Sequence, residues 1–328
     1  MSAAPRLARV RALAKINLDL RVLARRPDGY HELRTVFQTV SLADTLEIAY
    51  SPARRTAIEL DDPLGLPDNL VLRAAQAAME AMGATGRVRM RLDKRIPMGA
   101  GLGGGSADAA AVLLALPALA GRPLDMASLC RLAGDLGSDV PFFLVGGAAV
   151  GIGRGTELFP LPDGPPRQAV LVAPRVSVST ADAYRRLSPR LTTELQQNKI
   201  FSFQSNILAG GVGGETANGV GGVGGETAND FEEVVFERHP VLGTWKKRMI
   251  RAGATAAMMT GSGSAVFGLF RNAGEAAGAL AKLGKYAEDE KTYRISLVGR
   301  ARYRALWWRA LEEHITGKTW PPRSRHSR

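Results

Sequence analysis

The sequence has few of the residues that build disulfide frameworks and metal clusters. Of its 328 residues, one is a cysteine (Cys130) and four are histidines. A single cysteine excludes an internal disulfide framework and a zinc site made of several cysteines. Four scattered histidines also argue against a histidine-rich metal site, and the sequence identifies no metal ligands. This cysteine usage fits a reducing compartment, so we expect a cytoplasmic protein.

Long hydrophobic runs are also missing. The longest apolar stretches, such as residues 109–120, are shorter than the ~20 residues that span a bilayer. The N-terminal residues include arginines but no apolar segment followed by a cleavage site. We therefore expect neither a transmembrane segment nor a secretory signal.

Positive charge is abundant but unevenly distributed. The chain has a formal net charge of +12, with 45% hydrophobic and 23% charged residues, which is an ordinary globular composition. Ten Lys or Arg and two Glu lie in residues 291–328, so this segment alone carries +8. The remaining 290 residues carry +4, so the high net charge says little about the main body.

Hydrophobic patterns predict a mixture of strands and helices. Residues 13–24 alternate between apolar and polar side chains, as in a half-buried strand, and Arg-Pro-Asp-Gly at 26–29 predicts a turn. Further strands are predicted at 33–50, 88–92, within 142–155, at 169–173, and on both sides of a turn within 256–270. Helices are predicted at 69–82, from about 106 to near 117, and at 124–136, 230–237, 240–252, 273–282 and 304–313.

Composition divides the chain into three parts. A proline-rich stretch at 159–168 places a domain boundary near 166, giving an N-terminal domain (1–166), a C-terminal domain (167–290) and a basic tail (291–328). The segment GGVGGETAN occurs twice, at 210–218 and 221–229. It is too short and glycine-rich for a solenoid unit, so we expect a flexible insertion at about 209–228 without a catalytic role. The last residues of the tail are expected to be solvated.

A glycine-rich loop precedes one of the predicted helices. Residues 97–106 read PMGAGLGGGS, and glycines let backbone N–H groups approach an anion closely. The positive end of the following helix favours the same ligand, so the loop is suited to a triphosphate. No Gly-Lys-Ser/Thr follows, which excludes a Walker A motif, and a Rossmann fingerprint is incomplete. Tight packing of a helix on a strand is the alternative explanation for these glycines.

Two ionisable residues have the types that phosphoryl transfer requires. Transfer to an alcohol needs a carboxylate to orient or deprotonate the hydroxyl and cations to balance the phosphoryl charge. Asp139 lies between a predicted helix end and the next apolar run, where it is either a turn residue or a catalytic base. Lys15 lies in an apolar strand, where it either snorkels at an edge or pairs with a buried carboxylate.

Five segments together carry a family resemblance. They lie at 14–48, 96–111, 137–158, 229–240 and 258–270. The sequence resembles the GHMP kinase superfamily, in which corresponding segments occur in the same order. The resemblance covers most of residues 10–270. The resemblance implies an α+β fold with an N-terminal domain like the second domain of ribosomal protein S5 and a ferredoxin-like C-terminal domain. It also implies use of ATP and Mg²⁺ at a site between the two domains.

The most specific segment is Asp-Gly-Tyr-His-Glu at 28–32. It is similar to the branch of the superfamily that phosphorylates the 2-hydroxyl of 4-diphosphocytidyl-2-C-methyl-D-erythritol in non-mevalonate isoprenoid synthesis. The branches that act on mevalonate, homoserine or galactose match it less well. The resemblance thus implies a small-molecule substrate with a cytidine diphosphate group.

The resemblance also assigns roles to individual residues. Asp139 is implied as the catalytic base and Lys15 as its cationic partner. Substrate contacts are implied for Asn17, Tyr30, His31, Thr180 and Tyr184, with the two tyrosines stacking on the cytosine. Gly261 to Ser264 would form a third loop facing the site. The residues implied in ATP binding are Pro97, Met98, Gly99, Ala100, Gly101, Leu102, Gly103, Gly104, Gly105, Ser106 and Ala107.

Two alternatives remain at the level of the sequence. One is a GHMP kinase that acts on a different alcohol. The other is a nucleic-acid-binding protein, suggested by the basic tail with Trp307, Trp308 and Trp320 and by the S5-like fold. The confinement of the charge to the tail argues against the second alternative, as does the phosphate loop that it leaves unexplained.

Overall fold

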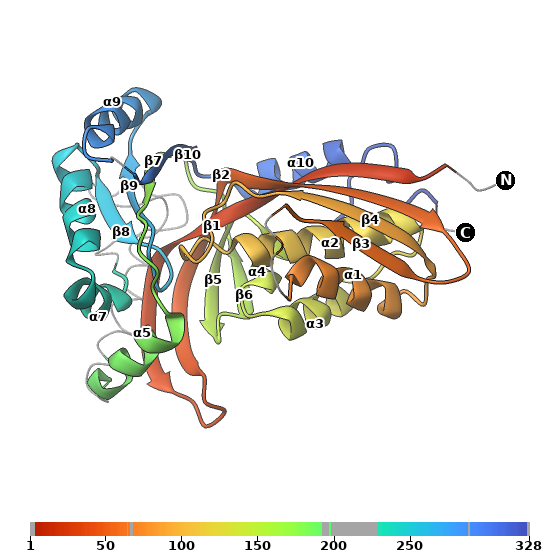
Figure 1. Cartoon of the computed structure of the whole chain (residues 1–328), viewed down its shortest axis with the longest axis horizontal. Helices are drawn as coiled ribbons and strands as arrows, with labels where there is room; N and C mark the ends of the chain where they lie inside the picture. Colours follow the sequence, from red (N-terminus) through yellow and green to blue (C-terminus); the bar gives the residue numbers. More distant parts are fainter. Residues whose placement is uncertain are drawn as a thin grey trace.

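The computed structural model describes residues 4–63, 65, 68–191, 197, 228–287 and 289–326. The insertion predicted at 209–228 lies outside these residues, apart from Ala228. No helix in the described part of the chain is long and apolar enough to cross a membrane. The molecule has two halves, each built on one sheet (Figure 1).

The N-terminal half is built on a hairpin of two long strands. Strands β1 (Arg6–Arg25) and β2 (His31–Pro52) are antiparallel and joined by the turn predicted at 26–29. The other strands of this sheet extend the hairpin in the order β3-β4-β2-β5-β6. Their bounds are β3 (Ala57–Asp61), β4 (Gly86–Asp93), β5 (Ala148–Gly153) and β6 (Glu157–Leu161).

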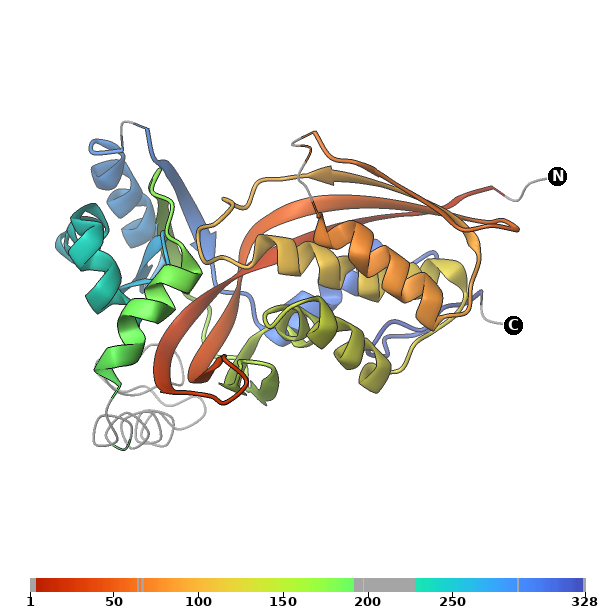
Figure 2. The same ribbon diagram turned by 60° about the horizontal axis from the view of Figure 1, so that its bottom comes forward.

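Helices cover one face of this six-stranded sheet (Figure 2). They are α1 (Leu70–Ala81), α2 (Gly104–Ala120), α3 (Met126–Leu136) and α4 (Val140–Val145). Helix α2 is apolar on all sides and is buried at every position from Ala107 to Leu119, so it forms the centre of the core. Its N-terminus, directly after the glycine loop, remains near the surface.

The C-terminal half has a four-stranded antiparallel sheet in the order β10-β7-β9-β8. Its strands are β7 (Gln168–Ala173), β8 (Ala256–Met259), β9 (Val266–Phe270) and β10 (Lys291–Ser296). Its helices are α5 (Thr180–Leu187), η1 (Ser188–Arg190), α7 (Phe231–Arg238), α8 (Pro240–Arg251) and α9 (Ala273–Gly284).

The two faces of this sheet have different partners. Val170 and Val172 on β7 pack with the C-terminal helices, whereas Ala169 and Leu171 pack with the middle of β1 and β2. This alternation follows the two-residue period of a strand. The β1–β2 hairpin therefore belongs to both halves and joins them through a continuous apolar contact.

These elements confirm the predicted α+β architecture, with two corrections. Residues 142–145 were expected in a strand but lie in α4, because Asp139 and Pro141 begin a short helix. The segment 291–328 was expected to be a basic tail with a helix at 304–313 and a solvated end. The helix is present as α10 (Arg300–Ala310) and packs on the N-terminal half through Trp307, but β10 was not expected and completes the C-terminal sheet. The end is not fully solvated, because Ser324 is buried and its hydroxyl donates to Ala118 O.

Candidate active site

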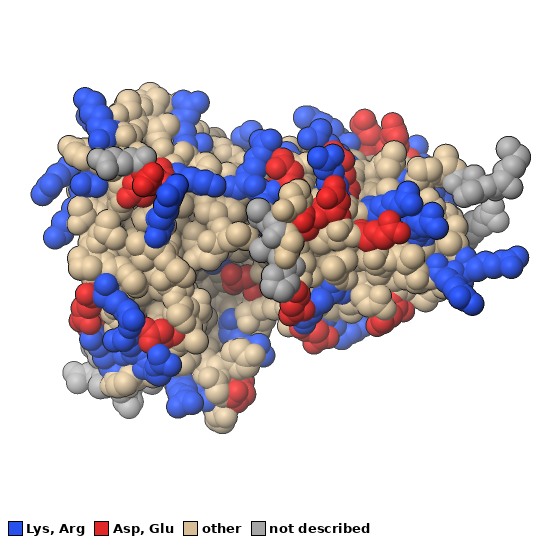
Figure 3. Space-filling view, viewed as in Figure 1, with Lys and Arg blue, Asp and Glu red and all other residues tan. Residues whose placement is uncertain are grey.

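A cleft of about 1180 Å³ lies between the two halves of the molecule and is visible as a hollow in the surface (Figure 3). Its walls come from β1, β2 and the turn between them, the glycine loop, the start of α4, the turn after β5, α5, η1, α7, and the loop between β8 and β9. Segments far apart in sequence thus meet around one space. Both halves of the protein contribute to it.

Lys15 and Asp139 meet in this cleft. Lys15 Nζ lies 3.5 Å from Asp139 Oδ2, and the lysine side chain is 4% exposed while the carboxylate is 37% exposed. Asp139 directly precedes α4, but its side chain caps no backbone N–H of that helix. The carboxylate is therefore available to a ligand in the cleft, with a buried cation beside it.

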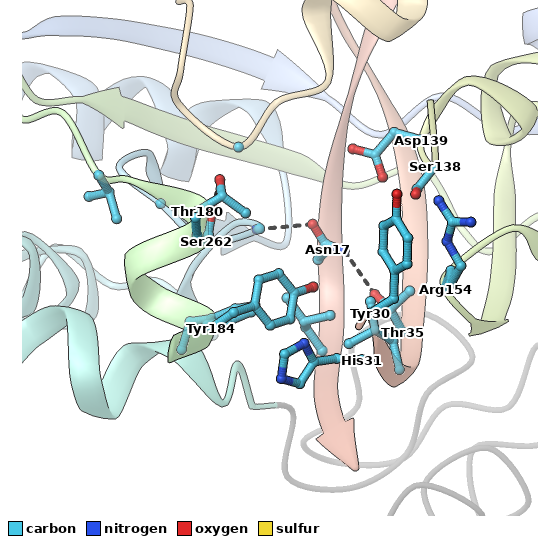
Figure 4. A pocket seen from close by; sticks show the side chains of 18 of the residues that line it. Asn17, Tyr30, His31, Thr35, Ser138, Asp139, Arg154, Thr180, Tyr184 and Ser262 are labelled. Carbon is cyan, nitrogen blue, oxygen red and sulfur yellow. Dashed lines mark hydrogen bonds between the residues drawn. The ribbon is translucent and has the colours of Figure 1, made fainter. Parts of the chain in front are cut away.

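Asn17 connects the lysine to the second domain. Its Oδ1 accepts hydrogen bonds from Lys15 Nζ (2.8 Å) and from the backbone N–H of Gly261 (3.0 Å). Its Nδ2 donates to Thr35 Oγ1 at 2.8 Å, and this bond is drawn in Figure 4. Because its oxygen is occupied within the protein, Asn17 fixes the position of the lysine.

The glycine loop closes one side of the cleft and touches both domains. Gly99, Gly101 and Gly103 have φ values between 65° and 76°, which disfavour other residues. A side chain on Gly101 would place its Cβ 2.2 Å from the carbonyl oxygen of Thr260. The backbone N–H of Lys15 donates to Leu102 O at 3.0 Å, so the loop is also bonded to β1. Close packing and exposed backbone are therefore both features of this loop.

The residues predicted to bind ATP differ in whether they face the cleft. Gly99, Gly101, Gly103 and Ser106 line it, and the others do not. Ala100, Leu102 and Ala107 are buried in the protein, and Met98 is 57% exposed. Pro97, Gly104 and Gly105 do not line the cleft. A role in ATP binding stays a prediction for each of these residues.

Aromatic side chains gather at the other end of the cleft. Tyr30 and Tyr184 lie on either side of Asn17 in Figure 4. The guanidinium carbon of Arg154 lies 3.5 Å from the centroid of the Tyr30 ring, a cation–π contact. His31 stacks on Tyr184 with ring centroids 4.5 Å apart. This end of the cleft therefore offers flat apolar faces beside hydrogen-bonding groups.

Burial at this end of the cleft favours the neutral forms of His31 and Tyr184. Burial, and then the charge of Arg25, lower the pKa of His31, whose Nε2 lies 2.6 Å from Ser188 Oγ. Burial, and then the charge of Asp139, raise the pKa of Tyr184 above its ordinary value. A neutral imidazole and a phenol can each donate one hydrogen bond and accept another.

The structure brings all the predicted substrate residues to this cleft, because Thr180 also lines it, with its Oγ1 2.8 Å from Ser262 Oγ. The sequence reasoning missed Ser138 and Arg154, which also line it. Arg154 stands between Gly153 and Gly155, both with positive φ, and this Gly-Arg-Gly turn is the signal that was available. In the described part of the chain, no three His, Cys, Asp or Glu residues gather as a metal site.

A non-Walker glycine loop beside a carboxylate–lysine pair, between two α+β domains, defines the class of the GHMP kinases. The family model for the GHMP kinase N-terminal domain matches residues 69–147, and the model for the C-terminal domain matches 221–289.

Similarity to curated proteins identifies one family within the GHMP kinases. The chain is 62% identical over 326 residues to 4-diphosphocytidyl-2-C-methyl-D-erythritol kinase of Solibacter usitatus, covering 98% of each chain. It is 41% identical to the enzyme of the same name from Geobacter metallireducens, covering 82% of this chain and 92% of that one. The chain belongs to the 4-diphosphocytidyl-2-C-methyl-D-erythritol kinase family of the GHMP kinases.

Solved structures agree with this assignment. A crystal structure of 4-(cytidine 5'-diphospho)-2C-methyl-D-erythritol kinase matches with a TM-score of 0.71 and 38% identity, covering 89% of this chain and 99% of that one. Homoserine kinase from Cytophaga hutchinsonii matches with a TM-score of 0.63 at 19% identity, covering 90% of this chain and 95% of that one. At this low identity, the similarity to homoserine kinase shows a shared fold only.

Proposed function

We propose that this protein transfers the γ-phosphoryl group of ATP to the 2-hydroxyl of 4-diphosphocytidyl-2-C-methyl-D-erythritol. One observation carries the proposal: the Asp139 carboxylate and the Lys15 ammonium meet in a cleft that also contains the glycine loop and the two tyrosines. Phosphoryl transfer needs a base and a cation at the acceptor hydroxyl and a cradle for the donor phosphates. The aromatic end suits a pyrimidine base.

In this proposal Asp139 accepts the proton of the 2-hydroxyl as the hydroxyl oxygen attacks the γ-phosphorus. The bond between that phosphorus and its bridging oxygen breaks, and ADP leaves. Lys15, whose Nζ lies 3.5 Å from Asp139 Oδ2, pairs with the carboxylate and offsets the charge on the transferring group. Asn17 acts on this pair indirectly, because its Oδ1 accepts a hydrogen bond from Lys15 Nζ.

The backbone of the glycine loop is the proposed cradle for the ATP phosphates, with Gly99, Gly101, Gly103 and Ser106 facing the cleft. Mg²⁺ fits beside it, because the Ser106 hydroxyl and the Asp139 carboxylate supply oxygen donors, and this ion commonly takes few protein ligands. When bound, the ion would neutralise charge on the β- and γ-phosphates. We also propose the cytoplasm as the location of the reaction.

Tyr30 and Tyr184 are the proposed stacking partners of the cytosine. Tyr30 is 49% exposed, and Arg154 supports its ring. The ring of Tyr184 is held by His31 and by the edge of Phe231, whose centroid is 4.8 Å away. Fixed aromatic faces lose little conformational entropy when a base stacks on them.

The test is ADP formation by the purified protein with ATP, Mg²⁺ and one acceptor at a time. We expect turnover with 4-diphosphocytidyl-2-C-methyl-D-erythritol and none above background with mevalonate, homoserine or galactose. Turnover with one of these three acceptors would agree with a GHMP kinase but would refute the proposed cytidine substrate. Trp307 is buried and the Trp320 indole N–H donates to Leu144 O, so two of the aromatic residues that suggested nucleic-acid binding are engaged within the protein.

A further inference from the structure

We propose that the C-terminal segment from α10 to residue 326 positions the catalytic carboxylate by holding the far end of α4. Tyr303 and Trp320 are the positioning residues. The inference rests on the proposed function, in which Asp139 is the base. It concerns a part of the chain that lies beyond the segments carrying the family resemblance and that lines no part of the cleft.

Helix α4 is the element that carries Asp139. It spans six residues, Val140–Val145, and Asp139 is the residue directly before it. At 1.5 Å per residue the helix is about 9 Å long, so a shift at its C-terminal end reaches the carboxylate. A helix this short is not stable by itself and depends on its tertiary contacts.

The C-terminal segment supplies the contacts at that end. The Tyr303 hydroxyl donates to the carbonyl of Phe143 at 2.5 Å, and the Trp320 indole N–H donates to the carbonyl of Leu144 at 2.9 Å. The last carbonyls of a helix have no partner within it, so these two donors satisfy groups that would otherwise be buried without one. Both donors come from side chains more than 150 residues away in the sequence.

Packing reinforces these two hydrogen bonds. Tyr303 is buried against Gly146, where a Cβ would lie 2.2 Å from the tyrosine ring. Gly146 follows α4 directly and has φ +64°, so the chain turns sharply under the ring. The Tyr303 ring also meets the Trp320 ring edge-on, with centroids 6.2 Å apart. The end of α4 is thus fixed by apolar contact and by hydrogen bonds together.

The same helix also touches the rest of the catalytic centre. The Phe143 ring leaves no room for a side chain on Gly103 of the glycine loop, where a Cβ would lie 2.8 Å away. The Phe142 ring lies 4.9 Å from that of Phe37, and Lys15 Nζ lies 5.4 Å from the Phe37 centroid. A displaced α4 therefore alters the base, its lysine and the loop together.

The experiment compares Tyr303→Phe and Trp320→Phe with a matched control. Tyr50→Phe removes a hydroxyl that donates to Thr85 O, a hydrogen bond that involves neither α4 nor the C-terminal segment. For each purified variant, kcat, both KM values and the melting temperature are measured, with kinetics at least 15 °C below melting.

We expect kcat to fall roughly tenfold in Tyr303→Phe and in Trp320→Phe, because a small misplacement of a catalytic group is costly. Both KM values should stay within about twofold of wild type, because the variants leave the cleft walls in place. The Tyr50→Phe control should keep the wild-type kcat even where its melting temperature falls equally. A loss of kcat without a matching loss in the control thus distinguishes a positioning role from a merely structural one.

The proposal is overturned if kcat per folded enzyme is unchanged in both variants while melting temperatures fall. If Tyr303→Phe does not fold, the kcat of Trp320→Phe alone tests the proposal. Trp320 is only partly buried, so its substitution disturbs the core less. Inactivity of the wild type with the cytidine substrate would refute the proposed function instead. Normal activity in wild type and variants would refute only this inference.

Discussion

At the scale of single residues, the chemistry rests on groups that are distant in sequence. Lys15 and Asp139 are separated by 124 positions and end 3.5 Å apart. Their types were predictable from what phosphoryl transfer requires, but their contact was not, because no local pattern encodes it. Arg154 was missed because a lone arginine in a turn is usually solvated. Its stacking on Tyr30 arises only in the folded chain.

Asp139→Asn tests the base directly. The amide cannot accept the hydroxyl proton, so we expect kcat to fall by at least ~100-fold, within the usual range for a general base. ATP binding should stay within about threefold of wild type, because the glycine loop is untouched. Turnover measured by ADP release and affinity measured by calorimetry check the two parts. Turnover near that of wild type would remove Asp139 from the mechanism.

At the scale of elements, strong periodicity was a reliable guide and short apolar runs were not. Helix α1 was predicted almost to its bounds, because helical spacing persists over its length. The strand predicted at 13–24 exists, but β1 begins at Arg6 and is not half-buried as expected, because Asn17 and Asp19 are buried as well. Residues 142–145 are apolar without a visible period and were wrongly expected in a strand. The pairing of β10 with β7 was also missed, since it joins segments about 120 residues apart.

The glycine loop provides a prediction about backbone geometry. Gly101 has φ +76°, and its Cβ would meet the Thr260 carbonyl at 2.2 Å, so Gly101→Ala should lower the free energy of unfolding by about 1–3 kcal/mol and weaken ATP binding. Gly134→Ala, within α3 and with open space around it, should instead stabilise by about 0.5–1 kcal/mol. Urea unfolding of both variants checks the contrast. An equal gain in the free energy of unfolding for both variants would show that the glycine loop tolerates a side chain at position 101.

At the scale of the whole molecule, the β1–β2 hairpin joins the two halves, and a buried charge lies at the junction. Asp19 on β1 accepts hydrogen bonds from Arg21 Nε and from the backbone N–H of Ala228 in the C-terminal half. Its other oxygen, Oδ2, has no hydrogen-bond partner among the described residues. Burial raises the pKa of Asp19 to about 6 despite the nearby arginine.

This shift predicts how stability depends on pH. In the unfolded chain Asp19 titrates near its ordinary value of 3.8, so between pH 4 and 6 the folded protein retains a proton that the unfolded chain has lost. The contribution of Asp19 to the free energy of unfolding therefore declines as the pH rises through this window, by up to roughly 3 kcal/mol.

Asp19→Asn removes that titration and keeps one oxygen as acceptor. Relative to wild type, the variant should gain about 1–3 kcal/mol between pH 4.5 and pH 7.5 in urea unfolding. Asp61→Asn, at an exposed carboxylate 3.6 Å from Arg91, is the control and should follow wild type. Parallel pH profiles for wild type and Asp19→Asn would contradict the account of this junction.

The most direct test of the proposed function is the ³¹P NMR spectrum of the product formed from ATP and 4-diphosphocytidyl-2-C-methyl-D-erythritol. Carbon 2 of this substrate carries a methyl group and no hydrogen. Transfer to its hydroxyl therefore predicts a phosphomonoester singlet without vicinal proton coupling, beside the intact diphosphate of the substrate and the signals of ADP. A split phosphomonoester signal would place the phosphate on another hydroxyl, and the absence of any phosphomonoester would contradict the assigned reaction.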